Sequence, residues 1–362
     1  MTAADEAGAR LPVALIGAGT IGRMHAQCMA THAQVVLAGI ADPTPAARDF
    51  AQVMGVPWFA EADELLAKVQ PGAAIVATPN ALHADAALAC IGRGVPVLVE
   101  KPIADSVPAA LRITAAAEAA GVSVLVGHQR RHGVAVQRAR ALIGEGAIGR
   151  AVAATLLATW LKPTAYFDLA WRRQSGGGPV LINLIHDIDL LRFLLGEVVA
   201  VQAMAGNAQR GFDVEDTAAA LLQLASGALA TALVSDAAVA PWNYDLAAGE
   251  AAHYPQQPVD ALMIAGTEGS ITLPQVHLWR YAGPRERWGW HEELRHEHQP
   301  LHRRDPYVEQ LRHLRAVAEG RELPLCSGTD ATGTLRAALA VLQAAKSGER
   351  VEVADLEGRM KD

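Results

Sequence analysis

Residues 11–22 read LPVALIGAGTIG, and this stretch decides how the first half of the chain folds. An apolar strand runs directly into a G-x-G-x-x-G turn. In such a turn the first glycine (Gly17) permits the sharp bend, the second (Gly19) lets the backbone approach a pyrophosphate, and the third (Gly22) lets the next helix pack closely on the strand. The pattern predicts a dinucleotide-binding turn, and an ordinary strand–turn–helix is the alternative.

The residues that follow the turn support this interpretation. Residues 23–30 continue as a helix, so the backbone N–H groups of Thr20 and Ile21 are expected in its first turn. Amides at a helix start, together with the helix dipole, bind an anion without a basic side chain. We therefore predict that Thr20 and Ile21, with the three glycines, contact the cofactor.

Asp42 is the expected ribose-binding residue. It lies 20 residues after Gly22, beyond a second apolar strand over residues 35–40. A carboxylate there accepts hydrogen bonds from ribose hydroxyls and repels a 2′-phosphate. The sequence thus predicts NAD, with NADP as the alternative because Arg48 is close. A second interpretation is that Asp42 only caps the turn into Pro43.

Strands and helices alternate up to residue 128. Further apolar strands are expected at residues 56–59, 73–77, 95–99 and 122–127, with helices at 81–92 and 108–120. This βαβ rhythm predicts a doubly wound parallel sheet, in which ligands bind beyond the carboxyl ends of the strands. Four side chains fall at or next to such ends and are predicted to line the cofactor site: Thr78, Asn80, Glu100 and Lys101.

Lys101 also has a predicted part in the chemistry. It emerges from a buried strand, where its ammonium can hold a substrate hydroxyl and a nearby cationic nicotinamide would lower its pKa. The alternative is a surface lysine at a strand end. The next residue, Pro102, is a candidate for a cis peptide bond, which would fix the direction of the lysine.

The pattern changes after residue 128, where strand-like runs follow one another with fewer helices between them. Strands are expected at residues 151–160, 198–205, 217–224, 228–235, 261–265 and 270–273, with helices at 134–142, 307–320 and 329–347. This arrangement predicts an α+β domain with a large, mostly antiparallel sheet. We therefore divide the chain into an NAD(P)-binding domain, residues 1–128, and a substrate-binding and oligomerisation domain, residues 129–362. Residues 241–258 receive no assignment.

A nearly all-apolar helix expected over residues 180–195 carries a polar stripe. It follows three glycines that would permit close approach of a ligand, and four polar residues recur on one face: Asn183, His186, Asp189 and Arg192. A buried polar stripe is costly unless each member is paired. We predict that His186 accepts a proton from a substrate hydroxyl, with Asp189 or Asn183 fixing its tautomer. A satisfied internal network without chemistry is the alternative.

Composition argues against several other classes of function. The 362 residues include 31 Lys and Arg against 38 Asp and Glu, a net charge of −7, which is unsuited to a nucleic-acid surface. We expect no membrane span, because no apolar run is long enough, and the polar N-terminus is unlike a signal peptide. Three widely separated cysteines are typical of a reduced, cytoplasmic protein.

A histidine-rich stretch contains His291, His296, His298 and His302. Such spacing can bind a metal, but the interspersed arginines oppose a cation and no cysteine pair accompanies the histidines. We therefore expect a solvated strand and loop there, and no metal site.

Together these motifs resemble the Gfo/Idh/MocA family of oxidoreductases (glucose–fructose oxidoreductase, inositol dehydrogenase, rhizopine catabolism). The resemblance spans almost the whole chain and rests on GAGTIGRMHA (17–26), ATPNALH (77–83), VEKPIA (99–104), GHQRRH (127–132) and GGGPVLINLIHDIDLLRFLLGE (176–197). It implies a Rossmann domain followed by a sheet domain whose open face makes homodimers or homotetramers. It also implies NAD(P)-dependent oxidation or reduction of a sugar, sugar acid, inositol or related polyol.

The resemblance also assigns site residues. Lys101 and His186 match the lysine and histidine that line the family's reaction site. His83 lies in a matching motif and joins the predicted cofactor-binding residues. The predicted substrate-binding residues are then Lys101, Arg131, Trp171, Asn183 and His186.

One position departs from the family pattern. Inositol-dehydrogenase-like members place an aspartate four residues before the histidine, where this chain has Ile182. An aspartate–histidine pair of that kind is therefore not expected. Two rival functions stay open beside the dehydrogenase: a non-catalytic dinucleotide-binding sensor, and an NAD-dependent lyase or glycosidase that uses transient oxidation.

Overall fold

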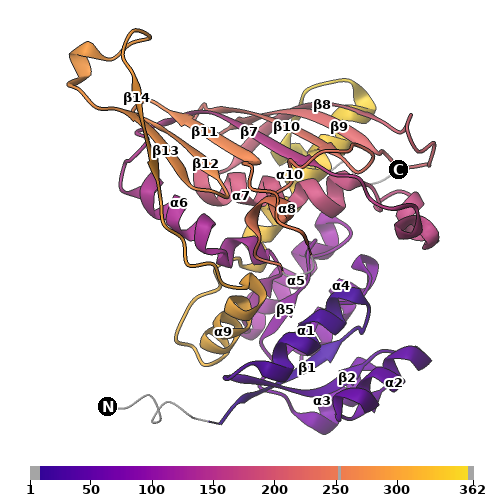
Figure 1. Ribbon diagram of the computed structural model, residues 1–362. Coiled ribbons are helices and arrows are strands. Elements are labelled where there is room, and N and C mark those ends of the chain that lie inside the picture. Colours follow the sequence, from indigo (N-terminus) through magenta and orange to yellow (C-terminus); the bar gives the residue numbers. More distant parts are fainter. Residues whose placement is uncertain (1–8, 252–253, 358–362) are drawn as a thin grey trace, which may run out of the picture. The chain divides into compact units, whose positions relative to one another are not determined.

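The computed structural model of the protein describes residues 9–251 and 254–357 (Figure 1). The chain forms two compact units. The first unit contains residues up to Gln129 together with Pro306–Thr332, and the second contains Arg130–Asp305 together with the residues from Gly333 onward. None of the helices described is both long enough and apolar enough to cross a lipid bilayer.

The first unit is built on a six-stranded parallel sheet, which confirms the predicted doubly wound fold. Its strands, in spatial order, are β3 (Trp58–Phe59), β2 (Val35–Ala41), β1 (Leu11–Ile16), β4 (Ala73–Val76), β5 (Val97–Val99) and β6 (Val124–Val126). The order reverses direction at β1 and β4, so a crevice is expected outside the carboxyl ends of these two strands. The residues of β4, β5 and β6 are all buried, as strands covered on both faces require.

Helices of the first unit connect these strands. They are α1 (Thr20–Thr31), α2 (Pro45–Met54), α3 (Ala62–Val69), α4 (His83–Ile91) and α5 (Val107–Ala120). Helices α1 and α2 bury apolar side chains against β1 and β2, where Met29 and Phe50 belong to the same core as Leu15 and Ile40. Helices α3, α4 and α5 contact one another in succession.

A late segment of the chain completes this first core, which differs from the predicted division at residue 128. Helix α9 (Pro306–Ala318) places Leu311, Leu314 and Val317 in the core of the first sheet. Farther along, the backbone N–H of Val126 on β6 donates to the carbonyl of Cys326. Apolar periodicity predicts a helix at this place, but it does not specify which of two sheets the helix covers, so the sequence alone assigned it to the second domain.

The second unit is built on a nine-stranded sheet, which confirms the predicted large, mostly antiparallel sheet. Its strands, in spatial order, are β14 (Leu294–His298), β13 (His277–Tyr281), β12 (Ser270–Leu273), β11 (Leu262–Gly266), β7 (Ala151–Thr159), β10 (Leu229–Ser235), β9 (Thr217–Leu224), β8 (Val198–Gly206) and β15 (Val351–Glu352). Only β7 and β10 pair in parallel among these neighbours.

One face of this sheet is covered and the other is open. Helices α6 (Val134–Gly144) and α7 (Ile185–Leu195) pack together, and they contact β12 and β7 respectively; Figure 1 shows both on the same side of the sheet. Burial alternates along β10, where every second residue is exposed up to Leu233. Such alternation is expected of a sheet with one face on the core and one in solvent.

Three local features were not predicted. Residues 241–258, which had no assignment, contain the short helix α8 (Tyr244–Ala248). Strand β13 was missed because its sequence, HLWRY, is mostly polar or aromatic. The helix expected over residues 180–195 begins as a π-helical turn, η5 (Val180–Leu184), before α7 continues it. Such π turns are frequent at functional sites.

Candidate active site

The glycine turn of the first unit is shaped by close backbone contacts. Gly17 has a φ of +95°, and a Cβ there would lie 2.6 Å from the carbonyl carbon of Ala77. A Cβ on Gly22 would lie 2.1 Å from the carbonyl oxygen of Gly17. Gly19, in contrast, has open space where its Cβ would be. Two glycines therefore let the protein pack on itself, and the middle one leaves room at the start of α1.

Asp42 connects the glycine turn to the turn that follows β2. Its Oδ2 accepts from the backbone N–H of Ala18 at 2.9 Å, and its Oδ1 accepts from the N–H and hydroxyl of Thr44 at 2.9 and 2.6 Å. Partial burial alone would raise the pKa of Asp42, but the hydrogen bonds from Thr44 and Ala18 lower it below its ordinary value. The carboxylate caps its own turn, as the alternative interpretation held, and also stays anionic beside the glycine turn.

His83 links two of the predicted cofactor loops. Its Nδ1 lies 2.8 Å from the carbonyl oxygen of Pro102, and its Nε2 lies 2.8 Å from that of Thr78. The ring is 1% exposed, and burial lowers its pKa although both carbonyls act in the opposite direction. His83 thus fastens the loop after β4 to the loop after β5. Asn80, between them in sequence, is partly buried.

Glu100 points into the protein, where it meets a residue that the sequence analysis missed. His25, fully buried on α1, places Nε2 2.7 Å from the Glu100 carboxylate. A Cβ on Gly127 would lie 2.8 Å from the same carboxyl group, so glycine is needed there. Burial alone would raise the pKa of Glu100, but the hydrogen bond and charge of His25 lower it. The motif GAGTIGRMHA contains His25, but nothing in that stretch indicates that Glu100 is its partner.

The Glu100–His25 pair fixes the backbone next to Lys101. The second carboxylate oxygen of Glu100 accepts from the backbone N–H of Lys101 at 3.2 Å. The Lys101–Pro102 peptide bond is cis, as predicted. Lys101 itself is only partly buried.

In the second unit, the first half of the predicted polar stripe is buried, and one of its atoms is open to further bonding. Asn183, on the η5 turn, and His186, on α7, are 6% and 7% exposed. The side-chain oxygen of Asn183 has no hydrogen-bond partner among the residues that the structure describes. A buried carbonyl of this kind is costly unless it is paired, so Asn183 marks a place where a ligand hydroxyl can donate.

The second half of the stripe is a closed network. Arg131 donates from Nε and Nη2 to the two oxygens of Asp189 at 2.8 and 2.6 Å, and Thr334 donates to Asp189 at 3.0 Å. Arg192 donates to Thr334 at 2.6 Å and pairs with Glu197. Both Arg131 and Asp189 are almost fully buried. For these residues the alternative of an internal network describes the observed contacts.

The glycines before η5 serve the protein's own packing. A Cβ on Gly177 would lie 2.3 Å from the carbonyl oxygen of Trp171, and one on Gly178 would lie 2.2 Å from the Glu215 carboxylate. Glu215 in turn accepts from the backbone N–H of Val180 at 3.1 Å. The close approach expected of a ligand is therefore made by protein atoms. Trp171 lies on this loop with 47% of its surface exposed.

Comparison with known proteins agrees with both units. A model of the oxidoreductase family Gfo/Idh/MocA, with an NAD-binding Rossmann fold, matches residues 11–128, and a Gfo/Idh/MocA C-terminal domain model matches residues 136–272. The 1,5-anhydro-D-fructose reductase of Ensifer adhaerens is 30% identical over 80% of this chain and 82% of its own length. The chain belongs to the Gfo/Idh/MocA family.

Two further similarities place this Gfo/Idh/MocA protein among dehydrogenases. The inositol 2-dehydrogenase of Rhizobium meliloti strain 1021 is 31% identical over 73% of this chain and 81% of its own length. The WlbA dehydrogenase of Bordetella pertussis, solved with NADH and UDP-GlcNAcA, superimposes with a TM-score of 0.78 at 25% identity, covering 95% of this chain and 98% of its own. The protein is an NAD(P)-dependent oxidoreductase.

The first unit of this family member fits the cofactor. The first backbone bond within α1 runs from the N–H of Arg23 to the carbonyl of Gly19, so the amides of Thr20 and Ile21 have no partner inside the helix. Open space at Gly19 leaves these amides accessible to a pyrophosphate. Asp42, whose pKa is lowered, is partly exposed and bonded to the glycine turn through the N–H of Ala18.

A buried acidic cluster in the second unit was also missed by the sequence analysis. Arg130 donates to Asp187 at 2.9 Å and to Asp245 at 3.0 Å, and its guanidinium lies over the ring of Tyr244. Burial raises the pKa of Asp187 to about 6 and that of the neighbouring Glu250 to about 7. Asp187 was not predicted because it falls outside the three-residue spacing that defines the polar stripe.

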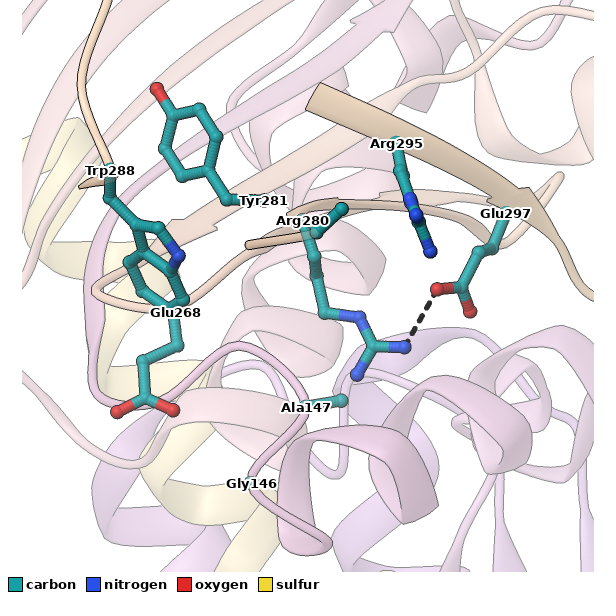
Figure 2. Close-up of a pocket in the computed structure, with 9 residues that line it drawn as sticks. Gly146, Ala147, Glu268, Arg280, Tyr281, Trp288, Arg295 and Glu297 are labelled. Carbon is teal, nitrogen blue, oxygen red and sulfur yellow. Dashed lines mark hydrogen bonds and ion pairs between the residues drawn. The ribbon is translucent and has the colours of Figure 1, made fainter. Parts of the chain in front are cut away.

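A surface pocket lies on the same unit beside the β13–β14 hairpin (Figure 2). It measures about 320 Å³ and is lined by charges of both signs, including Arg280 and Glu297, which pair at 2.7 Å. None of the predicted site residues lines it.

Proposed function

We propose that the protein transfers a hydride between a nicotinamide and a ring hydroxyl of a sugar, sugar acid, inositol or related polyol. The observation that carries this proposal is the buried polar face of Asn183 and His186, with the Asn183 oxygen unsatisfied within the described chain. A hydroxyl-rich ring supplies the donors that such a face lacks. The names of both curated relatives, an anhydrofructose reductase and an inositol dehydrogenase, agree with a ring substrate.

Each proposed side chain has a separate task. Bound NAD⁺ supplies the hydride acceptor. His186 takes the proton of the substrate hydroxyl, which requires a neutral imidazole near neutral pH. The side-chain oxygen of Asn183 accepts a hydrogen bond from a second hydroxyl and so orients the substrate ring. Lys101 donates to the reacting oxygen as its negative charge develops, and the Glu100–His25 pair holds the backbone from which Lys101 extends.

Other predicted residues take positioning parts in this proposal. Arg131 is committed to Asp189 by two hydrogen bonds, so it stabilises the α7 helix on which His186 lies. Trp171 offers an exposed apolar face on the loop before η5, suited to the CH face of a sugar ring. Thr78 and Asn80 belong to the loop that His83 fastens, where they are available to the cofactor.

The test combines an absorbance screen with one substitution. Purified protein is mixed with NAD⁺ or NADP⁺ and a panel of inositols, aldoses, anhydrosugars and sugar acids, and NAD(P)H is followed. His186→Ala is expected to lower turnover by about a hundredfold or more while NAD⁺ affinity stays near normal. His291→Ala, at an exposed loop position, is the control and keeps full activity.

The outcomes separate the rival functions. Unchanged turnover in His186→Ala removes the histidine from the mechanism. No NAD(P)H with any member of the panel favours the non-catalytic sensor. Cofactor that stays bound through gel filtration, with substrate consumed and no net NADH formed, favours a lyase or glycosidase that uses transient oxidation. A clear NADP⁺ preference contradicts the assignment of Asp42.

We also propose a cytoplasmic homodimer or homotetramer assembled through the open face of the nine-stranded sheet. Large apolar side chains lie exposed on that face, among them Leu221 and Leu229, 56% and 61% exposed. Burial of such a patch is the usual reason for it to exist. Leu229→Lys is expected to shift the mass measured by light scattering toward the monomer, and an unchanged mass would move the interface elsewhere.

A further inference from the structure

We propose that His277, His296 and His298 form a binding site for a divalent transition metal of the zinc type on the outer face of the β13–β14 pair. Two of these histidines were seen in the sequence, but the third belongs to the strand that was missed. The site is separate from the residues assigned to the oxidoreductase reaction. Neutral imidazole nitrogen is the donor that Zn²⁺, Cu²⁺ and Ni²⁺ share.

Strand geometry brings the three side chains to one place. His296 and His298 are two residues apart on β14, so they project from the same face. His277 on β13 lies directly opposite His298 in the antiparallel register, and Trp279 lies opposite His296. A His-x-His strand with a third histidine on its neighbour presents three imidazoles from a rigid backbone.

The His277 ring already contacts both of the others. The ring centroids of His277 and His296 are 4.6 Å apart, and those of His277 and His298 are 5.1 Å apart. His296 Nε2 lies 2.7 Å from His277 Nδ1. Two nitrogens bound to one tetrahedral zinc at 2.0–2.1 Å are about 3.3 Å apart. The pair therefore opens by only about half an ångström, and the His298 ring, now at 84° to His277, turns to complete the site.

The arginines of β13 and β14 project away from the face that carries the histidines. Arg280, Arg295 and Glu297 alternate with the three histidines along the two strands, so they project to the opposite face. Figure 2 shows Arg280 and Glu297 there, directed at the surface pocket. On the histidine face, the described residues of β13 and β14 are otherwise Trp279, Tyr281 and Leu294.

The groups around the trio include one carboxylate that favours a cation, one guanidinium that opposes it, and space for a further ligand. Asp260, close enough to act on the charge of His277, accepts from the hydroxyl of Thr272 at 2.6 Å. A cavity of about 270 Å³ lies against His298 and gives room for a water ligand. Arg303 also lines this cavity, where it donates to Gln275.

Trp279 fixes one ring of the trio. Its indole stacks on His296 with centroids 4.2 Å apart and planes 11° from parallel. This stacking holds the His296 ring in place before a metal arrives, which reduces the ordering cost of binding. The same contact makes Trp279 a reporter, because Cu²⁺ held by His296 would quench its fluorescence.

The test is calorimetric titration of ZnCl₂ into full-length, tag-free protein that has been dialysed against EDTA. The expected result is one zinc ion bound per chain. His277→Gln and His298→Gln are each expected to weaken zinc binding by about tenfold or more, because each removes one of three protein ligands. His302→Gln, an exposed histidine outside the trio, is the control and binds zinc as the parent does.

Two results would overturn the proposal. One is the absence of stoichiometric zinc binding by the parent protein. The other is equal binding by the parent and by both trio variants, which would place any zinc elsewhere on the surface. Circular dichroism of each variant checks folding, and His298→Gln, at an exposed position, keeps the test valid if His277→Gln unfolds. Quenching by Cu²⁺ that survives in a Trp279→Phe variant would likewise contradict the assigned place.

Discussion

The two halves of the polar stripe on η5 and α7 differ in how completely their atoms are paired. In the later half, Asp189 and Arg192 exchange hydrogen bonds with Arg131 and Thr334, and they are nearly inaccessible. In the earlier half, Asn183 is just as buried but keeps an unpaired oxygen within the described chain. Buried polar groups are normally hydrogen-bonded, so a buried group without a partner indicates a place where a ligand can bind. The same helix thus separates structural residues from candidate catalytic residues.

The largest expected effect comes from breaking the closed half. Arg131→Met removes both guanidinium hydrogen bonds to the buried Asp189 and keeps the hydrogen bond from Thr334. Removing one partner of a buried ion pair typically costs about 3–5 kcal/mol. The free energy of unfolding measured with urea should therefore fall by that amount. The double variant Arg131→Met/Asp189→Leu is expected to recover part of the loss. A shift below about 1 kcal/mol, as for a surface pair, would show that the network does not hold the helix.

A smaller effect is expected from the partly satisfied acidic cluster of the second unit. The pKa of Glu250 is raised to about 7 by burial and by Asp245, so the folded state favours the protonated acid. Its contribution to stability is present below the unfolded pKa near 4.5 and is lost as pH rises through 7.

Glu250→Gln is neutral at every pH, so it tests whether the raised pKa of Glu250 causes this pH dependence of stability. The variant should exceed the parent by about 1–3 kcal/mol in unfolding free energy at pH 8 and match it near pH 4. Asp187, whose pKa is about 6, is present in both proteins, so the part of the pH dependence of stability that it causes is common to parent and variant. An equal pH slope in parent and variant would contradict the raised pKa.

The smallest effect on stability is expected in the open half of the stripe. Asn183→Ala removes an oxygen that has no partner within the described chain, so the unfolding free energy should change by less than about 1 kcal/mol. Under the proposed function, the KM for the ring substrate should rise while NAD⁺ affinity is unchanged. Stability loss as large as that of Arg131→Met would erase the distinction between the two halves.

How far the sequence predicts the molecule depends on whether a contact is local. The glycine turn, the parallel sheet implied by βαβ units and the choice of Pro102 as a candidate for a cis bond all follow from neighbouring residues. The structure confirms them, and none of them depends on a residue far away in the sequence. His25 and Arg130 could not be placed in the same way, because their partners Glu100 and Asp187 lie 75 and 57 residues away.

Helix periodicity also left the outcome of each polar position undecided. Asn183, His186, Asp189 and Arg192 share a face by spacing alone, but the spacing does not show which of them meets another side chain. Asp189 is closed by Arg131 from another segment and by Thr334, which follows 145 residues later. Such pairing depends on tertiary packing, which a single sequence does not display.

Helix α9 has a consequence for the order in which the chain is made. The first sheet takes Leu311, Leu314 and Val317 into its core, although residues 130–305 are synthesised in between. The nascent first unit therefore leaves the ribosome with an apolar surface that its own contiguous sequence cannot cover. Folding in translation order is the usual course for a multidomain chain. Here it cannot complete the first unit until α9 has been translated, and α9 follows every strand of the second sheet except β15.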